Sequence, residues 1–415
     1  MKIESNEIKK IAKKIQQKGG NLYLVGGAVR DKLLGQEEKD TDYCVTGITA
    51  EEFKELFPEA NIRGKFFEVF DINKTEFAMA RIEKKIETGH SGFEIQTGKE
   101  INIVQDLARR DITINSMAVN VLTKELIDPF TGQEDLNNKI IRATTKAFKE
   151  DPLRVYRVAR FASTLGFKVE SGTIQMMKGL KKELNTLSVE RVFIEFKKAL
   201  EGETPSIFFQ ILKKAEVLDV HFKEIYDLIG AIQPEKYHPE GDSYNHTMMV
   251  VDHSVKHTKK LETRFACLVH DLGKGAIPKE EYPHHYLHDK TGPTLVRNMC
   301  NRLKMPTSWK KCGITSAKEH MIAGIFYKLK PGKKVSFIER VSKTILGLEG
   351  MKIVVNCDKF VTAMEEEIEI DFEKIGQKMM HKINGKYIEE KYNIKPSKEF
   401  AKILHEERIK WLTNY

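Results

Sequence analysis

The sequence predicts an α+β protein, because strand signals are confined to its first third and helical periodicity runs through the rest. Leu22 to Val25 is an apolar run that ends at two glycines, and Glu76 to Ala80 alternates like a strand. From about Phe148 onward, apolar residues recur at helical spacing at positions 155, 158, 159, 162 and 165. We therefore expect a small mixed sheet with helices, followed by an all-helical remainder.

Local signals define the first elements. The apolar run 22–25 is expected to be a strand, Gly26-Gly27 a tight turn with exposed N–H groups, and Ala28 to Leu34 a helix. Thr49-Ala50-Glu51-Glu52 has the pattern of a capping box, so a helix should begin there and end before Pro58. Further along, Phe66 to Ile72 is expected to be extended.

Breaks in the pattern mark the later boundaries. Gly230, Pro234 and Gly241 indicate a boundary near residue 230. The basic run 328–334, which contains Pro331 and Gly332, is expected to form an exposed loop.

Composition narrows the class of protein. The 415 residues carry 69 Lys plus Arg against 60 Asp plus Glu, a net charge of +9 that favours a polyanionic partner, although a basic protein without one would look the same. The five cysteines lack any C-x-x-C spacing, so neither a disulfide framework nor a zinc knuckle is indicated. No apolar leader or bilayer-length stretch is found, and we expect a cytoplasmic protein with no membrane partner.

The glycine turn and two nearby carboxylates predict a first catalytic site. In a strand, Asp40 and Asp42 face the same side and can hold divalent cations, with Mg²⁺ favoured by their hard oxygen ligands. A triphosphate fits the exposed N–H groups of the preceding turn. Either feature alone is usually a plain turn or a solvated acidic pair, but their order and closeness favour the catalytic interpretation. Neither a Walker pattern nor a G-x-G-x-x-G dinucleotide pattern is present.

Further motifs follow in a fixed order. They are Arg109 to Ala118, Asp128 to Gly132 with Asp135-Leu136, and Glu150 to Phe161, and a looser continuation follows at Leu187 to Arg191. Together with the glycine turn, this string resembles the bacterial class II CCA-adding enzymes, which are tRNA nucleotidyltransferases. The resemblance implies Asp40 and Asp42 as catalytic metal ligands, and Gly27, Arg30, Arg110 and Arg157 as nucleotide-binding residues. Without these neighbours, Arg110 would be interpreted as a salt-bridge partner of Asp106 or Asp111.

Base choice is expected at Asp151 and Arg154. A carboxylate accepts from the exocyclic amine that cytosine and adenine share, and a guanidinium donates to the ring nitrogen beside it, which excludes uracil and guanine. The alternative is structural, since Asp151 as N-cap and Pro152 at the first helical position would begin any helix well. The polar stretch Arg81 to Phe93 occupies the place of a flexible loop in the family and favours full CCA addition, although an ordinary hairpin remains open.

A second constellation lies downstream. His246, then His270-Asp271 on an apolar helix, then Asp358, resemble the HD phosphohydrolase superfamily. Imidazoles with carboxylates hold Mg²⁺ or a transition metal such as Ni²⁺. His285 and His288 resemble auxiliary residues of the HD domain fused to some CCA-adding enzymes, whereas His284 and His320 are interpreted as either solvated or capped histidines. The resemblance implies phosphatase, 2′-nucleotidase and 2′,3′-cyclic phosphodiesterase activities.

The predicted organisation has four domains. Residues 1–140 form a nucleotidyltransferase head, 141–228 a helical neck and body, 229–362 an HD domain and 363–415 a helical tail. Expected partners are tRNA, at its acceptor end and elbow, with ATP and CTP. Two alternatives remain, a bacterial poly(A) polymerase and a metal-dependent phosphohydrolase with an RNA-binding head. The sequence leaves open whether the protein is a monomer or a homodimer.

Overall fold

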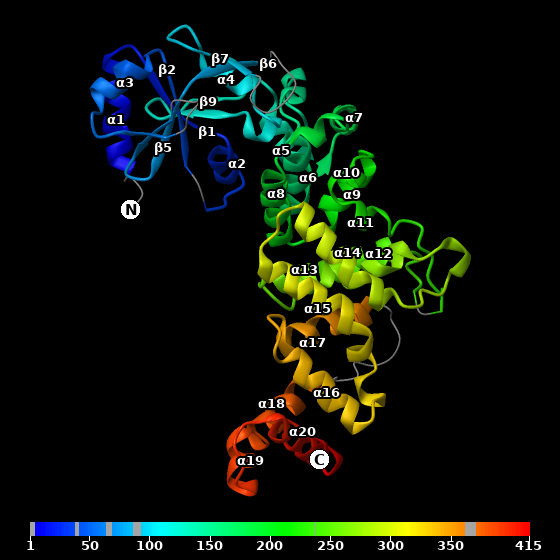
Figure 1. Ribbon diagram of the computed structural model, residues 1–415. Helices are drawn as coiled ribbons and strands as arrows, with labels where there is room; N and C mark the ends of the chain where they lie inside the picture. Colours follow the sequence, from blue (N-terminus) through cyan, green and yellow to red (C-terminus); the bar gives the residue numbers. More distant parts are fainter. Residues whose placement is uncertain (1–4, 38–40, 64–68, 86–92, 237, 362–370) are drawn as a thin grey trace. The chain divides into compact units, whose positions relative to one another are not determined.

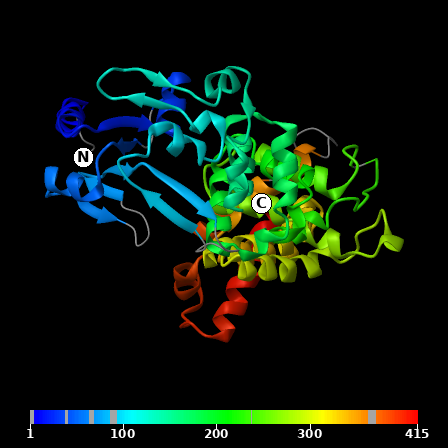
Figure 2. The same cartoon turned by 90° about the horizontal axis from the view of Figure 1, so that it is seen from above.

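The computed structural model describes residues 5–37, 41–63, 69–85, 93–236, 238–361 and 371–415. Contacts divide the chain into two compact units. Unit 1 comprises Met1–Ser188 with Lys214–Val217, and unit 2 comprises Val189–Lys213 with Leu218–Tyr415. Strands and helices mix in unit 1, whereas unit 2 is built of helices and loops (Figures 1 and 2).

Unit 1 contains a seven-stranded mixed sheet in the order β3-β4-β5-β2-β1-β8-β9. Neighbouring strands are antiparallel except for β2 and β5, which run parallel. Its strands are β1 (Asn21–Val25), β2 (Asp42–Thr46), β3 (Asn61–Arg63), β4 (Val69–Ile72), β5 (Thr75–Met79), β8 (Ala118–Asn120) and β9 (Leu126–Ile127).

Period-two alternation gives this sheet two buried faces. Leu22 and Val45 pack with the helices α1 (Ser5–Gln17) and α3 (Ala50–Leu56) on one face, around an aromatic core that includes Phe53. Tyr23 and Cys44 pack on the other face against α4 (Ile103–Ala108). Figure 1 shows α1 and α3 beside one another at the blue end of the chain. The capping box at Thr49 is confirmed, because its hydroxyl accepts from Glu52 N–H and the Glu52 carboxylate accepts from Thr49 N–H.

Smaller elements complete unit 1. The strands β6 (Arg81–Lys85) and β7 (Phe93–Thr97) form an antiparallel hairpin, and β10 (Ile140–Ile141) pairs in parallel with β11 (Lys168–Val169). The helices are α2 (Gly27–Leu33), α5 (Gly132–Asn137), α6 (Arg154–Leu165) and α7 (Ser171–Gly179), with 3₁₀ turns at Thr113–Asn115, Lys146–Glu150 and Glu183–Thr186.

Unit 2 packs its helices around two apolar centres. An aromatic group with Phe196, Phe222 and Trp309 lies near its start, and a second core forms around Phe337 and Phe372. The helices are α8 (Val189–Glu201), α9 (Ser206–Lys214), α10 (Leu218–His221), α11 (Lys223–Tyr226), α12 (Ser243–Ser254), α13 (Leu261–Val269), α14 (His288–Arg302), α15 (Thr307–Gly324), α16 (Pro331–Val341), α17 (Gly347–Val361), α18 (Phe372–Lys382), α19 (Gly385–Tyr392) and α20 (Lys398–Thr413).

The α+β fold class is confirmed, with one local correction. The expected loop over 328–334 is wrong, because Pro331 begins α16, where its fixed φ suits the first helical position and no N–H is needed. The division into four domains stays a prediction. Among the described residues, the helices are too short or too polar to span a lipid bilayer.

Candidate functional site

The glycine turn of unit 1 lies where β1 ends. Gly26 has a φ of +72°, a conformation that favours glycine, and it precedes the first turn of α2. A Cβ at Gly26 would lie 3.0 Å from Nη1 of Arg110, so the glycine lets this guanidinium lie directly against the turn. Across the sheet, Asp42 is paired with Val25, the last residue before the turn.

Asp42 is exposed at the start of β2, where a cation and its ligands have access to it. Its other neighbour in the sheet is Glu76 of β5. Asp40, the predicted second carboxylate, lies outside the described residues. The joint binding of a cation by Asp40 and Asp42 therefore stays a prediction, whereas the structure places Asp42 close to the glycine turn.

Buried Asp106 holds two arginines beside the turn. Its Oδ1 accepts from Nε and Nη2 of Arg109, at 3.0 and 2.7 Å, and its Oδ2 accepts from Nη2 of Arg110 at 3.1 Å. Burial alone would raise the pKa of Asp106, but the two guanidinium groups outweigh it and lower the pKa to about 2. The ion pair between Arg110 and Asp106, which was the alternative interpretation of Arg110 from the sequence, is thus present. With two guanidinium groups and one carboxylate, these three residues keep a net positive charge.

A second network joins α2 to α6. Arg30 donates from Nη1 to Asn115 Oδ1 at 2.7 Å, and Asn115 donates from Nδ2 to Asp111 Oδ1 at 3.4 Å. Arg157 donates from Nε to Asp111 Oδ2 at 2.7 Å. Burial would raise the pKa of Asp111, but its arginine neighbours, Arg157 above all, lower it to about 2. The guanidinium groups of Arg30 and Arg157 both lie within 5.6 Å of the Phe161 ring centre.

The predicted base-reading residues make backbone contacts. The Oδ1 of Asp151 accepts from Leu153 N–H at 3.0 Å, and α6 begins at Arg154, two residues later than the expected Pro152. Arg154 is buried and donates from its two Nη atoms to the carbonyl oxygens of Ala147 and Arg109, both at 2.6 Å. Any contact of Arg154 with a base therefore competes with these two bonds.

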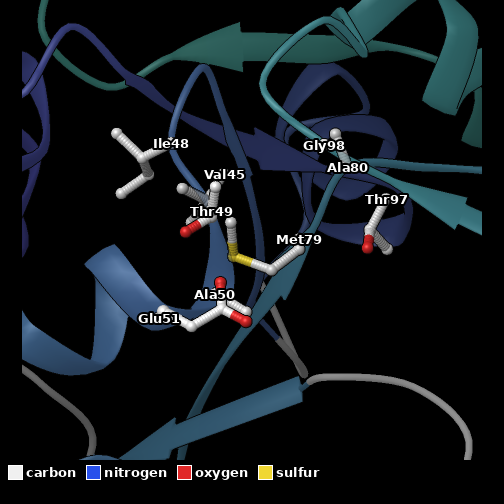
Figure 3. A pocket seen from close by; sticks show the side chains of 9 residues that line it. All are labelled: Val45, Ile48, Thr49, Ala50, Glu51, Met79, Ala80, Thr97 and Gly98. Atoms are coloured by element: carbon white, nitrogen blue, oxygen red, sulfur yellow. The ribbon is translucent and has the colours of Figure 1, made fainter.

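A cavity of about 250 Å³ lies elsewhere in unit 1 (Figure 3). Val45 and Met79 line it from neighbouring strands, and Thr49 and Glu51 line it from the start of α3. None of the predicted site residues is among its lining residues. We therefore do not assign the nucleotide to this cavity.

In unit 2, five helices and one turn bring six polar side chains together. His246 comes from α12, Asp358 from α17 and His320 from α15. His270 and Asp271 follow the end of α13, and His288 begins α14. All six are buried except Asp358, which is partly exposed. The residues of this cluster are spread over 112 positions of the sequence, from His246 to Asp358.

The four residues predicted as metal ligands surround one point. His246 Nε2 lies 3.0 Å from Asp358 Oδ1 and 4.0 Å from Asp271 Oδ2. His270 Nε2 lies 3.3 Å from Asp271 Oδ2 and 3.8 Å from Asp358 Oδ1. Among the described residues, His270 Nε2 and Asp271 Oδ1 have no hydrogen-bond partner despite their burial. A divalent cation fits this mixed nitrogen and oxygen donor set and would satisfy such atoms.

Outer contacts orient the imidazoles. His270 Nδ1 donates to the carbonyl oxygen of Cys267 at 2.8 Å, and His246 Nδ1 contacts Glu240 Oε1 at 2.7 Å. A ring whose Nδ1–H is held in this way presents Nε2 inward, which is the usual arrangement of metal-binding histidines. Glu240 was not predicted as a site residue.

Charge is concentrated at this cluster. Burial lowers the pKa of His270, but the carboxylates of Asp271 and Asp358 outweigh it and raise the pKa to about 10. Burial raises the pKa of Asp271, but His270 and Lys274 outweigh it and hold that pKa well below its usual range. Lys274 Nζ lies 2.5 Å from Asp271 Oδ2 and donates to Gln233 Oε1 at 2.6 Å. The two carboxylates thus concentrate negative charge beside His270 Nε2, where it would favour a bound cation.

Of the two histidines predicted as auxiliary residues, one lies in the cluster and the other does not. His288 joins the cluster, with Nε2 3.4 Å from Asp271 Oδ1. His285 does not, because its Nε2 contacts the carbonyl oxygen of Ile232 at 2.9 Å. His320, which the sequence left as a solvated or capped histidine, is buried with Nε2 3.2 Å from Asp271 Oδ1. No local motif surrounds His320, so its position had to come from the fold.

Comparisons with known proteins agree with this arrangement. Family models match for "Poly A polymerase head domain" over residues 22–142, "Probable RNA and SrmB- binding site of polymerase A" over 166–228, and "HD domain" over 243–341. The fold and sites therefore define a nucleotidyltransferase of the poly(A) polymerase head class that carries an HD domain. Both of these families are metal-dependent.

Relatives make the assignment more specific. The chain is 43% identical over 327 residues to the multifunctional CCA protein of Pseudoalteromonas atlantica, covering 77% of this chain and 80% of that protein. It is 45% identical over 309 residues to that of Psychromonas ingrahamii, covering 72% and 75%. The chain belongs to the multifunctional CCA protein family.

Solved structures share the fold at lower identity. A CCA-adding enzyme in complex with CTP is 20% identical, with a TM-score of 0.67 over 98% of this chain and 89% of that chain. The Thermotoga maritima CCA-adding enzyme complexed with tRNA is 19% identical, with a TM-score of 0.66 over 99% and 91%. At this identity the likeness concerns the fold alone.

Proposed function

We propose that the chain adds C, C and A to the 3′ end of tRNA from CTP and ATP, without a nucleic-acid template and with release of pyrophosphate. The observation that carries this proposal is the placement of Asp42 across from the glycine turn, with Arg110 against Gly26. The naming of its relatives as multifunctional CCA proteins supports the same activity.

The chain's residues have distinct tasks in this reaction. Asp42, together with Asp40, would hold Mg²⁺, which when bound activates the attacking 3′-hydroxyl and neutralises the leaving pyrophosphate. Gly27, Arg30 and Arg110 would bind the triphosphate, because guanidinium groups fork onto phosphate oxygens and keep their charge. Asp106 and Asn115 hold these guanidinium groups in position before substrate arrives.

Base selection is assigned to α6 and to Asp151, which lies just before it. Asp151 and Arg154 would read the edge that cytosine and adenine share, and Arg157 would contact the nucleotide from the next turn of the helix. Arg157 is already oriented by Asp111. Arg154 would have to exchange its bonds to backbone carbonyls for bonds to the base.

One assay separates this proposal from its alternatives. Purified protein is incubated with tRNA lacking its 3′ end and all four triphosphates, and products are read base by base. Addition of C, C and then A supports the proposal. A run of A indicates a poly(A) polymerase, and no addition by folded protein indicates a phosphohydrolase whose head only binds RNA.

A second activity is favoured by the inward Nε2 atoms of the HD cluster. His246, His270, Asp271 and Asp358 would hold a divalent cation, which when bound lowers the pKa of water for attack on a phosphate ester. The mixed nitrogen and oxygen donors favour a transition metal such as Ni²⁺ over Mg²⁺. We assign 2′,3′-cyclic phosphodiesterase, 2′-nucleotidase and phosphatase chemistry to this site. Hydrolysis of a 2′,3′-cyclic phosphate by chelator-treated protein, before and after each metal is added, tests it.

tRNA is the proposed polymer substrate, bound through its acceptor end and elbow. The match of residues 166–228 to an RNA-binding family supports this partner. Binding of tRNA that weakens steeply as salt rises is the expected behaviour. A cytoplasmic location stays part of the proposal.

A further inference from the structure

We propose that His253 and His257, at the end of α12, form a surface site for a divalent transition metal, with Ni²⁺ or Cu²⁺ as the expected ion. The pair begins seven residues after His246 of the HD cluster, which is roughly 10 Å along the helix axis. We assign neither residue to nucleotide addition or to phosphate hydrolysis. The proposed site is therefore independent of both activities.

The spacing along the chain brings the two rings together. His253 belongs to the last turn of α12, which ends at Ser254, and residues four apart lie on the same face of a helix. The turn continues as far as His257, because Lys256 N–H donates to the carbonyl oxygen of His253 at 3.2 Å and His257 N–H donates to that of Ser254 at 3.1 Å. The ring centres are 4.7 Å apart, with the ring planes inclined by 54°. The backbone thus holds the two imidazoles side by side.

The distance between the two nitrogens selects a kind of metal. His253 Nε2 and His257 Nε2 lie 2.9 Å apart. Two ligand atoms that lie about 2.0–2.1 Å from an ion are about 2.9 Å apart when they meet it at a right angle, and about 3.3 Å apart when the ion is tetrahedral. Right angles between neighbouring ligands are typical of Cu²⁺ and Ni²⁺, whereas Zn²⁺ prefers a tetrahedron. The pair therefore matches two neighbouring positions of a square-planar or octahedral ion.

The same distance also suits a hydrogen bond, in which one Nε2–H donates to the lone pair of the other ring. An ion would replace this shared hydrogen, and each ring would then carry its hydrogen on Nδ1. Metal binding requires neutral imidazoles. Burial lowers the pKa of His253, and the neighbouring His257 and Lys256 lower it further. His253 is therefore neutral at pH 7, in the form that binds a metal.

Charges near the pair narrow the choice of ion further. The last carbonyl groups of α12 give this end of the helix a partial negative charge, which favours a cation. Lys256 opposes the cation, whereas Lys260 Nζ is paired with Glu349 Oε2 at 2.9 Å. Mg²⁺ depends on carboxylate and other oxygen ligands, whereas imidazole suits Ni²⁺ and Cu²⁺. We therefore expect a transition metal here and no binding of Mg²⁺.

The residues between the histidines limit the site to binding. In the H-E-x-x-H pattern of zinc proteases, a glutamate follows the first histidine and acts as the general base. Here Ser254 takes that place, and its buried hydroxyl donates to the carbonyl oxygen of Val251 at 2.6 Å. Among the described residues, groups of three or more metal-binding side chains lie around the HD cluster. The surface ion would thus have the two histidines as its protein ligands, with water at its other positions.

A resin-bound metal tests the exposed pair selectively. Ni²⁺ held by nitrilotriacetate keeps a pair of neighbouring coordination positions free, and the buried histidines of the HD cluster cannot reach it. We expect the full chain, without an affinity tag, to be retained on this resin and released by imidazole. His253→Gln and His257→Gln should each abolish retention. His284→Gln is the matched control, because His284 is also exposed, beside Tyr286, and this variant should be retained.

Counting free Ni²⁺ gives a second measurement. Equilibrium dialysis compares the unsubstituted protein with His257→Gln, so that ions bound in the head and in the HD cluster are common to both. We expect the variant to bind one Ni²⁺ fewer per chain, with thermal melting to verify its fold. Equal Ni²⁺ binding by the two folded proteins would overturn the proposal and leave the histidines as a hydrogen-bonded pair. Loss of resin binding in His284→Gln as well would also contradict it, because retention would then not depend on this pair.

Discussion

Asp42 is the residue on which nucleotide addition depends most directly in our proposal. Asp42→Ala should lower the rate by about 100-fold or more, the loss that follows removal of one strong electrostatic contact to a transition state. Glu76→Ala is the matched control, because Glu76 is also exposed and is paired with Asp42 in the sheet. Single-turnover addition of CTP measures both variants, with thermal melting to verify folding. A folded Asp42→Ala protein with the unmodified rate would contradict the metal assignment.

Asp151 has two possible roles that one pair of variants separates. Asp151→Ala removes the carboxylate together with its hydrogen bond to Leu153 N–H, so we expect a loss of about 1 kcal/mol in stability and of about 1–3 kcal/mol in base discrimination. Asp151→Asn keeps an acceptor for Leu153 N–H but adds an amide donor toward the base. Relaxed choice among the four triphosphates with near-normal melting in Asp151→Asn supports base reading. Normal base choice in both variants would leave only the hydrogen bond to Leu153 N–H.

Buried Asp106 predicts a pH dependence of stability. Its pKa is lowered to about 2 from an ordinary 3.8. A lowered pKa contributes stability that is present above the unfolded value and is lost as pH falls through the folded value, here between about pH 4 and 2. Asp106→Asn should cost about 2 kcal/mol at pH 7 and progressively less toward pH 2. Urea unfolding across this range measures the difference, and a cost independent of pH would contradict the ionic role.

At the scale of elements, the contact between Gly273 and α14 is open to a simple test. Gly273→Ala should destabilise unit 2 and weaken metal binding, because the added Cβ overlaps the His288 carbonyl oxygen. Gly324→Ala at the end of α15 is the control, since a Cβ there meets nothing within 4 Å, and it should be neutral or stabilising by up to about 1 kcal/mol. Melting temperature and bound metal distinguish the two. Equal effects would mean that close approach at Gly273 is unimportant.

Elements with strong local signals could be predicted from the sequence. The strand before Gly26 and the capping box at Thr49 depend only on neighbouring residues. The structure confirms both predictions. The loop expected around Pro331 was wrong, because proline begins a helix as readily as it ends one. The inward position of His320 depends on the packing of α15 against α13 and α14, which no local pattern encodes. Asn115 and Asp111 are likewise linked to Arg30 only through the fold.

At the scale of the whole molecule, the two candidate sites belong to different compact units. Their proposed ligands also differ, with carboxylates in the head and mixed histidine and carboxylate in the HD cluster. We therefore expect Asp271→Ala to eliminate hydrolysis of a 2′,3′-cyclic phosphate while CCA addition continues, and Asp42→Ala to do the reverse. Both activities are measured on both folded variants. Joint loss would mean that the sites are coupled or that one is misassigned.

The contacts from Arg30 through Asn115 and Asp111 to Arg157 have a further consequence. They form a relay between the phosphate end and the base end of the proposed nucleotide site. A triphosphate that draws Arg30 away from Asn115 would loosen the hold of Asp111 on Arg157. Binding of the phosphates at one end of the site would thereby change the freedom of the side chain that contacts the nucleoside at the other end.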